Sequence, residues 1–521
     1  MVETSPAPPN LPVARRLLYA ALTTLLFAAA LEGALAALGL ANPAARLSLT
    51  RGFSTRARYF VPDPAQPGTV HTQMFSGDSP EVVVPPRGPR VRVLLMGESS
   101  TEGFPEEYIQ ERLDAALPDP GFEVINLGRH GYGSERVRIL LAQALELHPD
   151  VVFIYLGHNE FVEQGFALEL AREWHSGVAL EAVDWLARLR TMNAAIEVAE
   201  SIAPGPSARP ESQQAERADA FRELTYDRTV LFYKVYRDNL AAMVELAREA
   251  GAGVLLSTVV PNDFDPPAVS TFPVNLPETT RADVFRLRGL ALGAIPERFR
   301  KGLIQTSPEA GVIHLRPSDW GELAPPAELA ARRARAAVPA PPELRALSAP
   351  FAGPPLWSDP RDWSAAVPEL LDTCAQVVQR APTEDERRLL SVTATRLNEV
   401  LTICPDHPIT LFELGLVRYL LGDDDGAARL LHAAAAYDRA PTHGNDVING
   451  VVRELAAQHA DDPDVRCVDA EQLVRAACPE GLVGYELMMD NCHLHAQARY
   501  ALVDMFVPQL LELGRAALTR R

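Results

Sequence analysis

Short apolar runs separated by polar, glycine-containing turns dominate the chain after residue 90. Three of these runs, 91–96 (VRVLLM), 122–127 (FEVINL) and 151–156 (VVFIYL), are almost continuously apolar, as strands buried on both faces of a parallel sheet are. Stretches of helical period at 105–117 and 134–147 lie between them. This alternation of strand and helix predicts a parallel sheet covered by helices.

The same rhythm returns further along the chain. A long stretch of helical period at 214–250 leads into a fourth apolar run at 253–260 (GVLLSTVV), and 465–468 has the character of a last strand. Apolar residues at helical spacing over 496–517 predict a closing helix. Residues 41–88 show no sustained period, so we expect a tether and an irregular lead-in there.

Between the fourth strand and the last one the pattern is helical. Residues 408–438 resemble one tetratricopeptide unit, and 365–404 resembles a weaker one. A solenoid needs about three stacked units. We therefore expect a helical insertion that rests on the α/β domain, preceded at 324–355 by an Ala- and Pro-rich linker or loosely packed helices.

The N-terminal segment 17–40 is apolar over 24 residues and carries a single charge, Glu32. A hydrocarbon core of about 30 Å needs roughly 20 such residues, so the segment predicts a transmembrane anchor with Glu32 near an interface or facing a partner. Arg15 and Arg16 directly before it favour a cytoplasmic N-terminus and an exported body. A cleaved signal peptide is the alternative, because Ala-Leu-Ala at 34–36 fits a cleavage site.

Composition narrows the class of protein. The 521 residues exceed one compact core, and a net charge of −19 argues against nucleic acid as a partner, because phosphates require clustered Lys and Arg. None of the five cysteines forms a CxxC pair or a zinc spacing. A disulfide between Cys374 and Cys404 is one possibility, and buried thiols are the commoner case.

Polar turns follow each of the first three strands. They are 97–101 (GESST), 126–134 (NLGRHGYGS) and 157–160 (GHNE), and a fourth polar block, 490–493 (DNCH), lies near the C-terminus. Because the carboxyl ends of parallel strands meet at one edge of a sheet, we expect the first three to converge there.

These blocks contain the groups that acyl transfer needs. Ser99 is a candidate nucleophile, His493 the base that takes its proton, and Asp490 the acid that orients the imidazole. The backbone N–H groups of Ser99 and Gly131 and the side-chain amide of Asn159 are candidate oxyanion donors.

Other interpretations of the same residues stay open at this point. His495 competes with His493 for the role of base, since residues two apart on an extended chain face the same way. Asp490 and the two histidines could instead bind a metal ion. Glu98 and Glu160 could serve as a glycosidase acid pair if their separation allowed it.

The four blocks, in this order along the chain, resemble those of the SGNH/GDSL hydrolase family. The resemblance covers about 90–265 and 445–515, and it implies a flavodoxin-like, three-layer α/β/α fold that hydrolyses or transfers ester-linked acyl groups without a metal or other cofactor. Glu98 and Glu160 stand where the family has Asp, and Leu494-His495 replaces a frequent Pro-Asn. The helical insertion is similar to that of membrane-bound bacterial members with repeat-like helices.

The chain is thus expected to be a membrane-anchored, single-pass esterase or O-deacetylase with an extracytoplasmic catalytic domain. Its substrate would be an ester-containing small molecule, lipid or glycan, and the helical insertion could bind a protein partner. Alternatives are an O-acyltransferase with the same triad, a helical scaffold with a secondary catalytic domain, and a protein secreted after signal cleavage. The expected parts are a cytoplasmic tail (1–16), the anchor (17–40), the lead-in (41–88), the first part of the hydrolase domain (89–265), the helical insertion (266–444) and the second part of the hydrolase domain (445–521).

Overall fold

The fold was analysed in a computed structural model of the whole chain. It describes residues 13–38, 40–41, 59–72, 81–163, 189–202, 226–267, 284, 287–288, 291, 382–478, 481–484 and 487–521. The chain divides into two compact units. One comprises Met1–Arg56 and Leu170–Arg209, and the other comprises Ala57–Glu169 and Pro210–Arg521.

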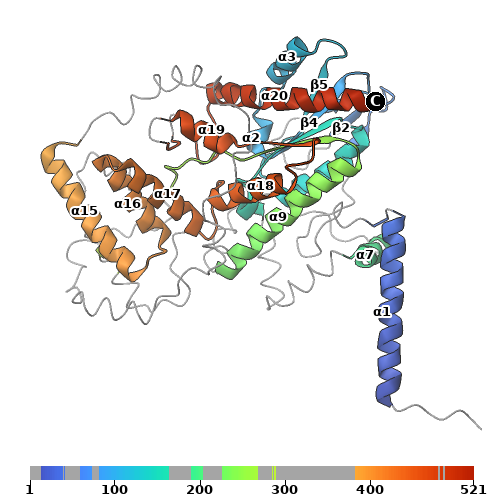
Figure 1. Cartoon of the computed structure of the whole chain (residues 1–521), viewed down its shortest axis with the longest axis horizontal. Helices are drawn as coiled ribbons and strands as arrows, with labels where there is room; N and C mark the ends of the chain where they lie inside the picture. The colour runs from blue at the N-terminus through green and yellow to red at the C-terminus, as the bar shows by residue number, and fades with distance from the viewer. Residues whose placement is uncertain are drawn as a thin grey trace, which may run out of the picture. The chain divides into compact units, whose positions relative to one another are not determined.

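A five-stranded parallel sheet forms the centre of the larger unit (Figure 1). Its strands, β4 to β8, have the spatial order β5-β4-β6-β7-β8, which is the doubly wound order of flavodoxin-like folds. The predicted strands are confirmed, and each ends within three residues of its expected end. The bounds are Val91–Gly97 (β4), Phe122–Asn126 (β5), Val151–Tyr155 (β6), Gly253–Ser257 (β7) and Val465–Val468 (β8).

Helices cover both faces of this sheet. Helices α3 and α20 pack on one face, and α9 and α18 on the other (Figure 1). Helix α4 packs against α9 and β4. An aromatic cluster of Phe104, Phe153, Tyr155 and Phe506 ties α20 to the sheet, with ring centroids 4.7–6.5 Å apart. The helix bounds are Glu106–Ala116 (α3), Ser134–Ala144 (α4), Tyr226–Glu249 (α9), Asp446–Gln458 (α18), Ala470–Ala477 (α19) and Ala496–Arg520 (α20).

The lead-in corrects one expectation. Instead of being irregular throughout, residues 41–88 contain a small antiparallel sheet of three strands. Its strands are Phe60–Pro62 (β1), Val70–Thr72 (β2) and Val83–Val84 (β3). Two or three residues are too few to produce a detectable alternation of apolar and polar positions, so the hydropathy pattern could not reveal them.

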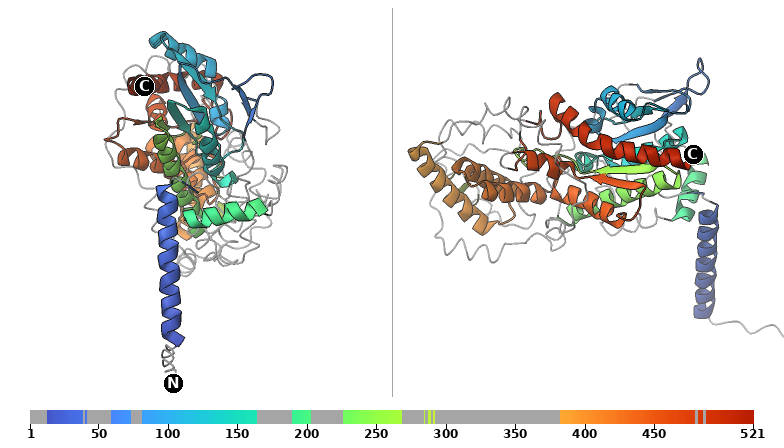
Figure 2. Two further views of the ribbon diagram at one scale, coloured as in Figure 1. Left: turned by 90° about the vertical axis from the view of Figure 1, so that its right-hand side faces the viewer. Right: turned by 45° about the horizontal axis from the view of Figure 1, so that its top comes forward.

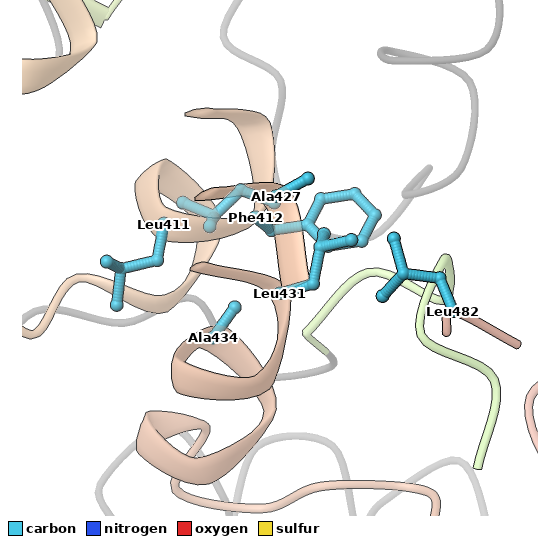
Figure 3. Packing of buried hydrophobic residues seen from close by; sticks show 7 residues of the cluster. Leu411, Phe412, Ala427, Leu431, Ala434 and Leu482 are labelled. Carbon is cyan, nitrogen blue, oxygen red and sulfur yellow. The ribbon is translucent and has the colours of Figure 1, made fainter. Parts of the chain in front are cut away.

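The helical region includes the helices Glu384–Ile403 (α15), Pro408–Leu421 (α16) and Asp424–Tyr437 (α17). Local chemistry sets their ends. Thr383 and Glu386 form a capping box, and Gly422 closes α16 with a left-handed φ of 81°. Helices α16 and α17 pack as a hairpin around Phe412 and Leu431 (Figure 3).

This hairpin is not separate from the hydrolase part of the chain. Leu482, which follows α19, belongs to the same apolar cluster (Figure 3). Phe264, which follows β7, packs against this cluster. The helical region therefore rests on the α/β domain. The Ala- and Pro-rich stretch 324–355 and residues 365–381 of the weaker repeat lie outside the described residues.

The smaller unit contains helix α1 (Val13–Ala37) and helix α7 (Arg190–Ile202). Helix α7 runs across the C-terminal end of α1 (Figure 2). The Glu32 carboxylate of α1 accepts hydrogen bonds from the backbone N–H groups of Arg190 and Thr191 at 2.7 and 2.8 Å. The one acidic residue of the apolar segment thus supplies acceptors for the first turn of a second helix, whose N–H groups have no partner within that helix.

Candidate active site

Ser99 opens the short helix α2 (Ser99–Glu102), directly beyond the end of β4. The strand has to turn sharply here, and Gly97 permits this, because a Cβ at that position would collide with Thr101 and with the carbonyl oxygen of Tyr155. Thr101 fixes the turn by donating its hydroxyl hydrogen bond to that same carbonyl. The Ser99 side chain is half-buried at the switch point between β4 and β6.

Ser99, His493 and Asp490 lie in one hydrogen-bonded chain. The Oγ of Ser99 is 2.8 Å from Nε2 of His493, and Nδ1 of His493 is 2.7 Å from Oδ2 of Asp490. Ser99 and His493 are separated by 394 residues. His495, the rival candidate base, instead occupies the N-cap position of α20.

The 490–493 turn is held by its own acid. Oδ1 of Asp490 accepts the backbone N–H groups of Cys492 and His493 at 2.9 and 2.8 Å. Burial by itself would raise the pKa of Asp490, but these two N–H groups and the imidazole together lower it below its ordinary value. Asp490 is therefore ionised near neutral pH and presents its free oxygen to the imidazole.

Two neighbouring loops hold the same turn from outside. Ser100 donates its hydroxyl hydrogen bond to the carbonyl of Cys492 at 3.0 Å, and the Asn262 amide donates to the carbonyl of Asp490 at 2.9 Å. The first contact comes from the β4 end and the second from the segment after β7. Both bonds fix the height of His493 relative to the sheet.

Asn159 and Gly131 lie on the loops that follow β6 and β5. The amide nitrogen of Asn159 is buried and has no hydrogen-bond partner among the described residues. A buried donor without a partner costs about 1–3 kcal/mol, so it is poised to receive an acceptor. Gly131 adopts φ = 72°, a left-handed conformation that glycine tolerates without strain.

An open cleft lies beside the Ser99–His493 pair. Its walls are mainly apolar, with Arg499 as the charged exception, and Arg499 is engaged with the carbonyl of Gly103 at 2.7 Å. The apolar walls come from Phe104, Tyr155, Met489 and Leu494.

Comparison with known proteins identifies this architecture. Residues 95–288 match the GDSL-like lipase/acylhydrolase family. The match indicates a hydrolase that acts on ester bonds. No curated protein matches the chain. The matched stretch ends before residue 490, so the turn with Asp490 and His493 reaches Ser99 only through the fold.

The two acids that depart from the GDSL-like pattern support the loops. The fully buried Glu98 carboxylate accepts three successive backbone N–H groups, those of Gly157, His158 and Asn159, at 3.1, 2.8 and 2.9 Å. Burial raises the pKa of Glu98 to about 8, although each of the three N–H groups lowers it. The residue before the candidate nucleophile therefore holds the loop that carries Asn159.

Glu160 likewise accepts hydrogen bonds that hold the end of the loop after β5. It accepts the backbone N–H and the hydroxyl of Ser134, at 2.6 and 2.8 Å, at the start of α4. Glu163, one turn later, accepts the N–H groups of Glu135 and Arg136. Glu98 and Glu160 are both buried and engaged with backbone, which argues against the glycosidase pair. Sequence reasoning did not single out Glu163, and its Glu-x-x-Glu spacing is a weak signal.

The alternative of metal ligation concerns the same turn. Among the described residues, Asp490, Cys492 and His493 have ligand atoms within 4.8 Å of one another. The Sγ of Cys492 lies 3.5 Å from Nδ1 of His493, and burial raises the pKa of this thiol well above its ordinary value. A protonated thiol is a poor metal ligand, because metals bind the thiolate. Cys404 is also a buried thiol, and Cys374 lies outside the described residues.

Proposed function

We propose that this hydrolase cleaves a carboxylic ester through an acyl-enzyme on Ser99. The observation that carries the proposal is the unbroken chain of hydrogen bonds from Ser99 Oγ through His493 to Asp490, at 2.8 and 2.7 Å. A serine hydroxyl is a weak nucleophile and needs an adjacent base to accept its proton. The imidazole has the required contact, and its second nitrogen faces a carboxylate that fixes the tautomer.

The steps follow from these contacts. Ser99 Oγ attacks the ester carbonyl carbon while its proton passes to Nε2 of His493. The tetrahedral intermediate collapses, the bond to the alcohol oxygen breaks, and His493 returns the proton to the departing alcohol. Water then attacks the acyl-enzyme, with His493 as base, and releases the carboxylic acid and the free Ser99 hydroxyl.

The oxyanion would be held by Asn159 together with the backbone N–H groups of Ser99 and Gly131. The partnerless, buried amide nitrogen of Asn159 supports this assignment, because an oxyanion would satisfy it. Loss of one such donor costs about 3 kcal/mol of transition-state stabilisation. The mainly apolar cleft beside Ser99 would receive an apolar part of an ester-containing small-molecule, lipid or glycan substrate.

Helix α1 is proposed to be an uncleaved membrane anchor. Residues Leu18–Ala37 are long and apolar enough to cross a bilayer, with a mean hydropathy of 1.7, and this window is not buried. The bonds from Glu32 to the first turn of α7 support retention, because cleavage after residue 36 would remove the acceptor of those two N–H groups. The catalytic part would then act at the outer face of the membrane.

The decisive test uses the full chain in detergent and a fluorophosphonate probe, with the labelled peptide mapped by mass spectrometry. Labelling of Ser99 that disappears in Ser99→Ala and falls at least about a hundredfold in rate in His493→Ala is expected. A folded protein that resists the probe would refute the acyl-enzyme. Activity that EDTA abolishes would favour a metal at the 490–493 turn, and an acylated alcohol among the products would favour transfer over hydrolysis.

A further inference from the structure

The segment between α17 and α18, residues 438–445, links the helical hairpin to the second part of the hydrolase domain. We call it the crossing segment. It is buried except at Thr442, which is half-buried. The Thr229 hydroxyl of α9 donates to the carbonyl of Arg439 at 3.0 Å, and the Asn445 side chain caps α18. The crossing segment is thus built into the domain.

One contact of the crossing segment reaches the loop after β6. The backbone N–H of Gly444 donates to Nδ1 of His158 at 2.9 Å, across 286 residues of sequence. His158 is 1% exposed and directly precedes Asn159. Because Nδ1 accepts this bond, the imidazole proton resides on Nε2. Burial lowers the pKa of His158 well below its ordinary value, with His443 and His493 lowering it further, so the ring is neutral.

A second contact reaches the 490–493 turn. The Asn491 amide donates to the carbonyl of Thr442 at 2.6 Å. Asn491 lies between the candidate acid Asp490 and the candidate base His493, and its own side chain does not line the cleft. The two bonds thus involve Thr442 and Gly444, which are two residues apart in the crossing segment. One bond reaches the 490–493 turn and the other reaches the loop after β6, so each loop with a candidate catalytic group is contacted.

Steric fit supports the same arrangement. A Cβ on Gly444 would collide with the Val259 side chain, and a Cβ on Gly157 would collide with Ile448 at the start of α18. The crossing segment therefore packs tightly on the segment after β7, and the loop after β6 packs tightly on the start of α18, the helix into which the crossing segment leads. Such contact transmits a displacement of one segment to the other, because packed interiors have few voids to absorb it.

We infer that His158 and Asn491 are positioning residues, which hold Asn159 and His493 in register with each other through the crossing segment. This inference rests on the proposed triad, and it adds the crossing segment to the structure that supports that site. The helical hairpin, which ends at Tyr437 and leads directly into the crossing segment, becomes part of the structure that aligns the oxyanion donor with the base. Neither residue lines the cleft beside Ser99.

The test compares steady-state ester hydrolysis by the full chain in detergent, using a short-chain nitrophenyl ester, for His158→Phe, His158→Asn and Asn491→Ala. Phe removes the acceptor for Gly444, whereas Asn places an oxygen close to the position of Nδ1. We expect kcat to fall about tenfold or more in His158→Phe and Asn491→Ala with KM nearly unchanged, because a misalignment of about 1 Å can cost up to about a hundredfold. His158→Asn is expected to recover most of the loss.

Thr393→Val is the matched control, because it removes a buried hydroxyl that bonds Leu389 in α15, away from both loops. It should lower the melting temperature without changing kcat. If Asn491→Ala and a folded His158 variant keep wild-type kcat, or if His158→Asn fails to recover activity that Phe removes, the positioning role is wrong while the triad stands. If Ser99→Ala, run alongside, retains activity, both proposals fall.

Discussion

Several acidic side chains in this protein are buried and hold loops in place by accepting hydrogen bonds from backbone N–H groups. Glu98 is fully buried between the candidate nucleophile and three backbone N–H groups, and Glu160 and Glu163 bind the start of α4. An aspartate at position 98 is the family's usual residue. The extra methylene of Glu98 lets its carboxyl group span the distance from α2 to the loop after β6. Glutamate in place of aspartate therefore changes the length of the side chain but keeps its carboxyl group.

Glu98→Asp is expected to lower kcat by about tenfold or more and to reduce thermal stability. A carboxylate one methylene shorter cannot reach all three N–H groups of the loop, and each buried N–H left without an acceptor costs about 1–3 kcal/mol. The loop that carries Asn159 then loses its fixed position. Enzyme kinetics and a thermal melt measure the two effects. The exposed Glu107 of α3 provides the control, and Glu107→Asp should be silent in both assays. An active, stable Glu98→Asp variant would show that the length of this side chain is immaterial.

At the scale of elements, hydropathy alone predicted the buried strands and the helices between them. Each of the strands β4, β5, β6, β7 and β8 is an apolar run interrupted by at most one charged residue, so the signal is strong even over four to seven residues. The strands of the small antiparallel sheet are too short for any period, and α7, α18 and α19 were not predicted. The apolar residues of these helices recur at helical spacing, and the caps Asn445 and Asp469 precede α18 and α19, so the sequence did carry a local signal for them.

The helix hairpin of α16 and α17 offers a test of how firmly this region supports the domain. Leu431 is 2% exposed and lies between Phe412 and Leu482, so Leu431→Ala should reduce the free energy of unfolding by about 2–5 kcal/mol (Figure 3). Because the hairpin leads into the crossing segment, we also expect kcat to fall.

Denaturant unfolding and ester hydrolysis of the same Leu431→Ala preparation measure these effects. The 44% exposed Leu389 of α15 is the matched control, and Leu389→Ala should leave both quantities close to those of the wild type. A Leu431→Ala protein that is destabilised but fully active would mean that the hairpin does not influence the catalytic loops.

For the whole molecule, the sequence contained the four blocks but not the contacts that join them. The order of Ser99, Gly131, Asn159 and His493 along the chain predicted convergence, because three of the blocks follow parallel strands. Nothing in the residues around Gly444 or Asn491 indicates that they bridge to His158 and Thr442 over 286 and 49 positions. Each of these bonds uses a backbone group of the crossing segment. Every residue other than proline has the same backbone groups, so the residue type does not predict the bonds.

The presence of an acidic residue, Glu32, in the apolar N-terminal segment is likewise explained only by the fold. The contacts of Glu32 also provide a test of the proposed anchor. Its carboxylate satisfies two N–H groups of α7, and Arg190 returns a bond to the carbonyl of Leu40 at 2.9 Å. Removing an N-terminal acceptor costs a helix about 1 kcal/mol, so Glu32→Ala should open α7 about fivefold more often. Trypsin should then cleave after Arg190 about fivefold faster in the detergent-solubilised full chain. Thr24→Ala, which alters a polar residue of α1 whose hydroxyl bonds its own helix at Ala20, is the control.

The intact mass of the wild-type protein, purified from membranes, tests whether the N-terminal segment is retained or cleaved. An unprocessed N-terminus supports the anchor, whereas a chain that begins near residue 37 would show that Glu32 is lost on maturation and that α7 stands without it.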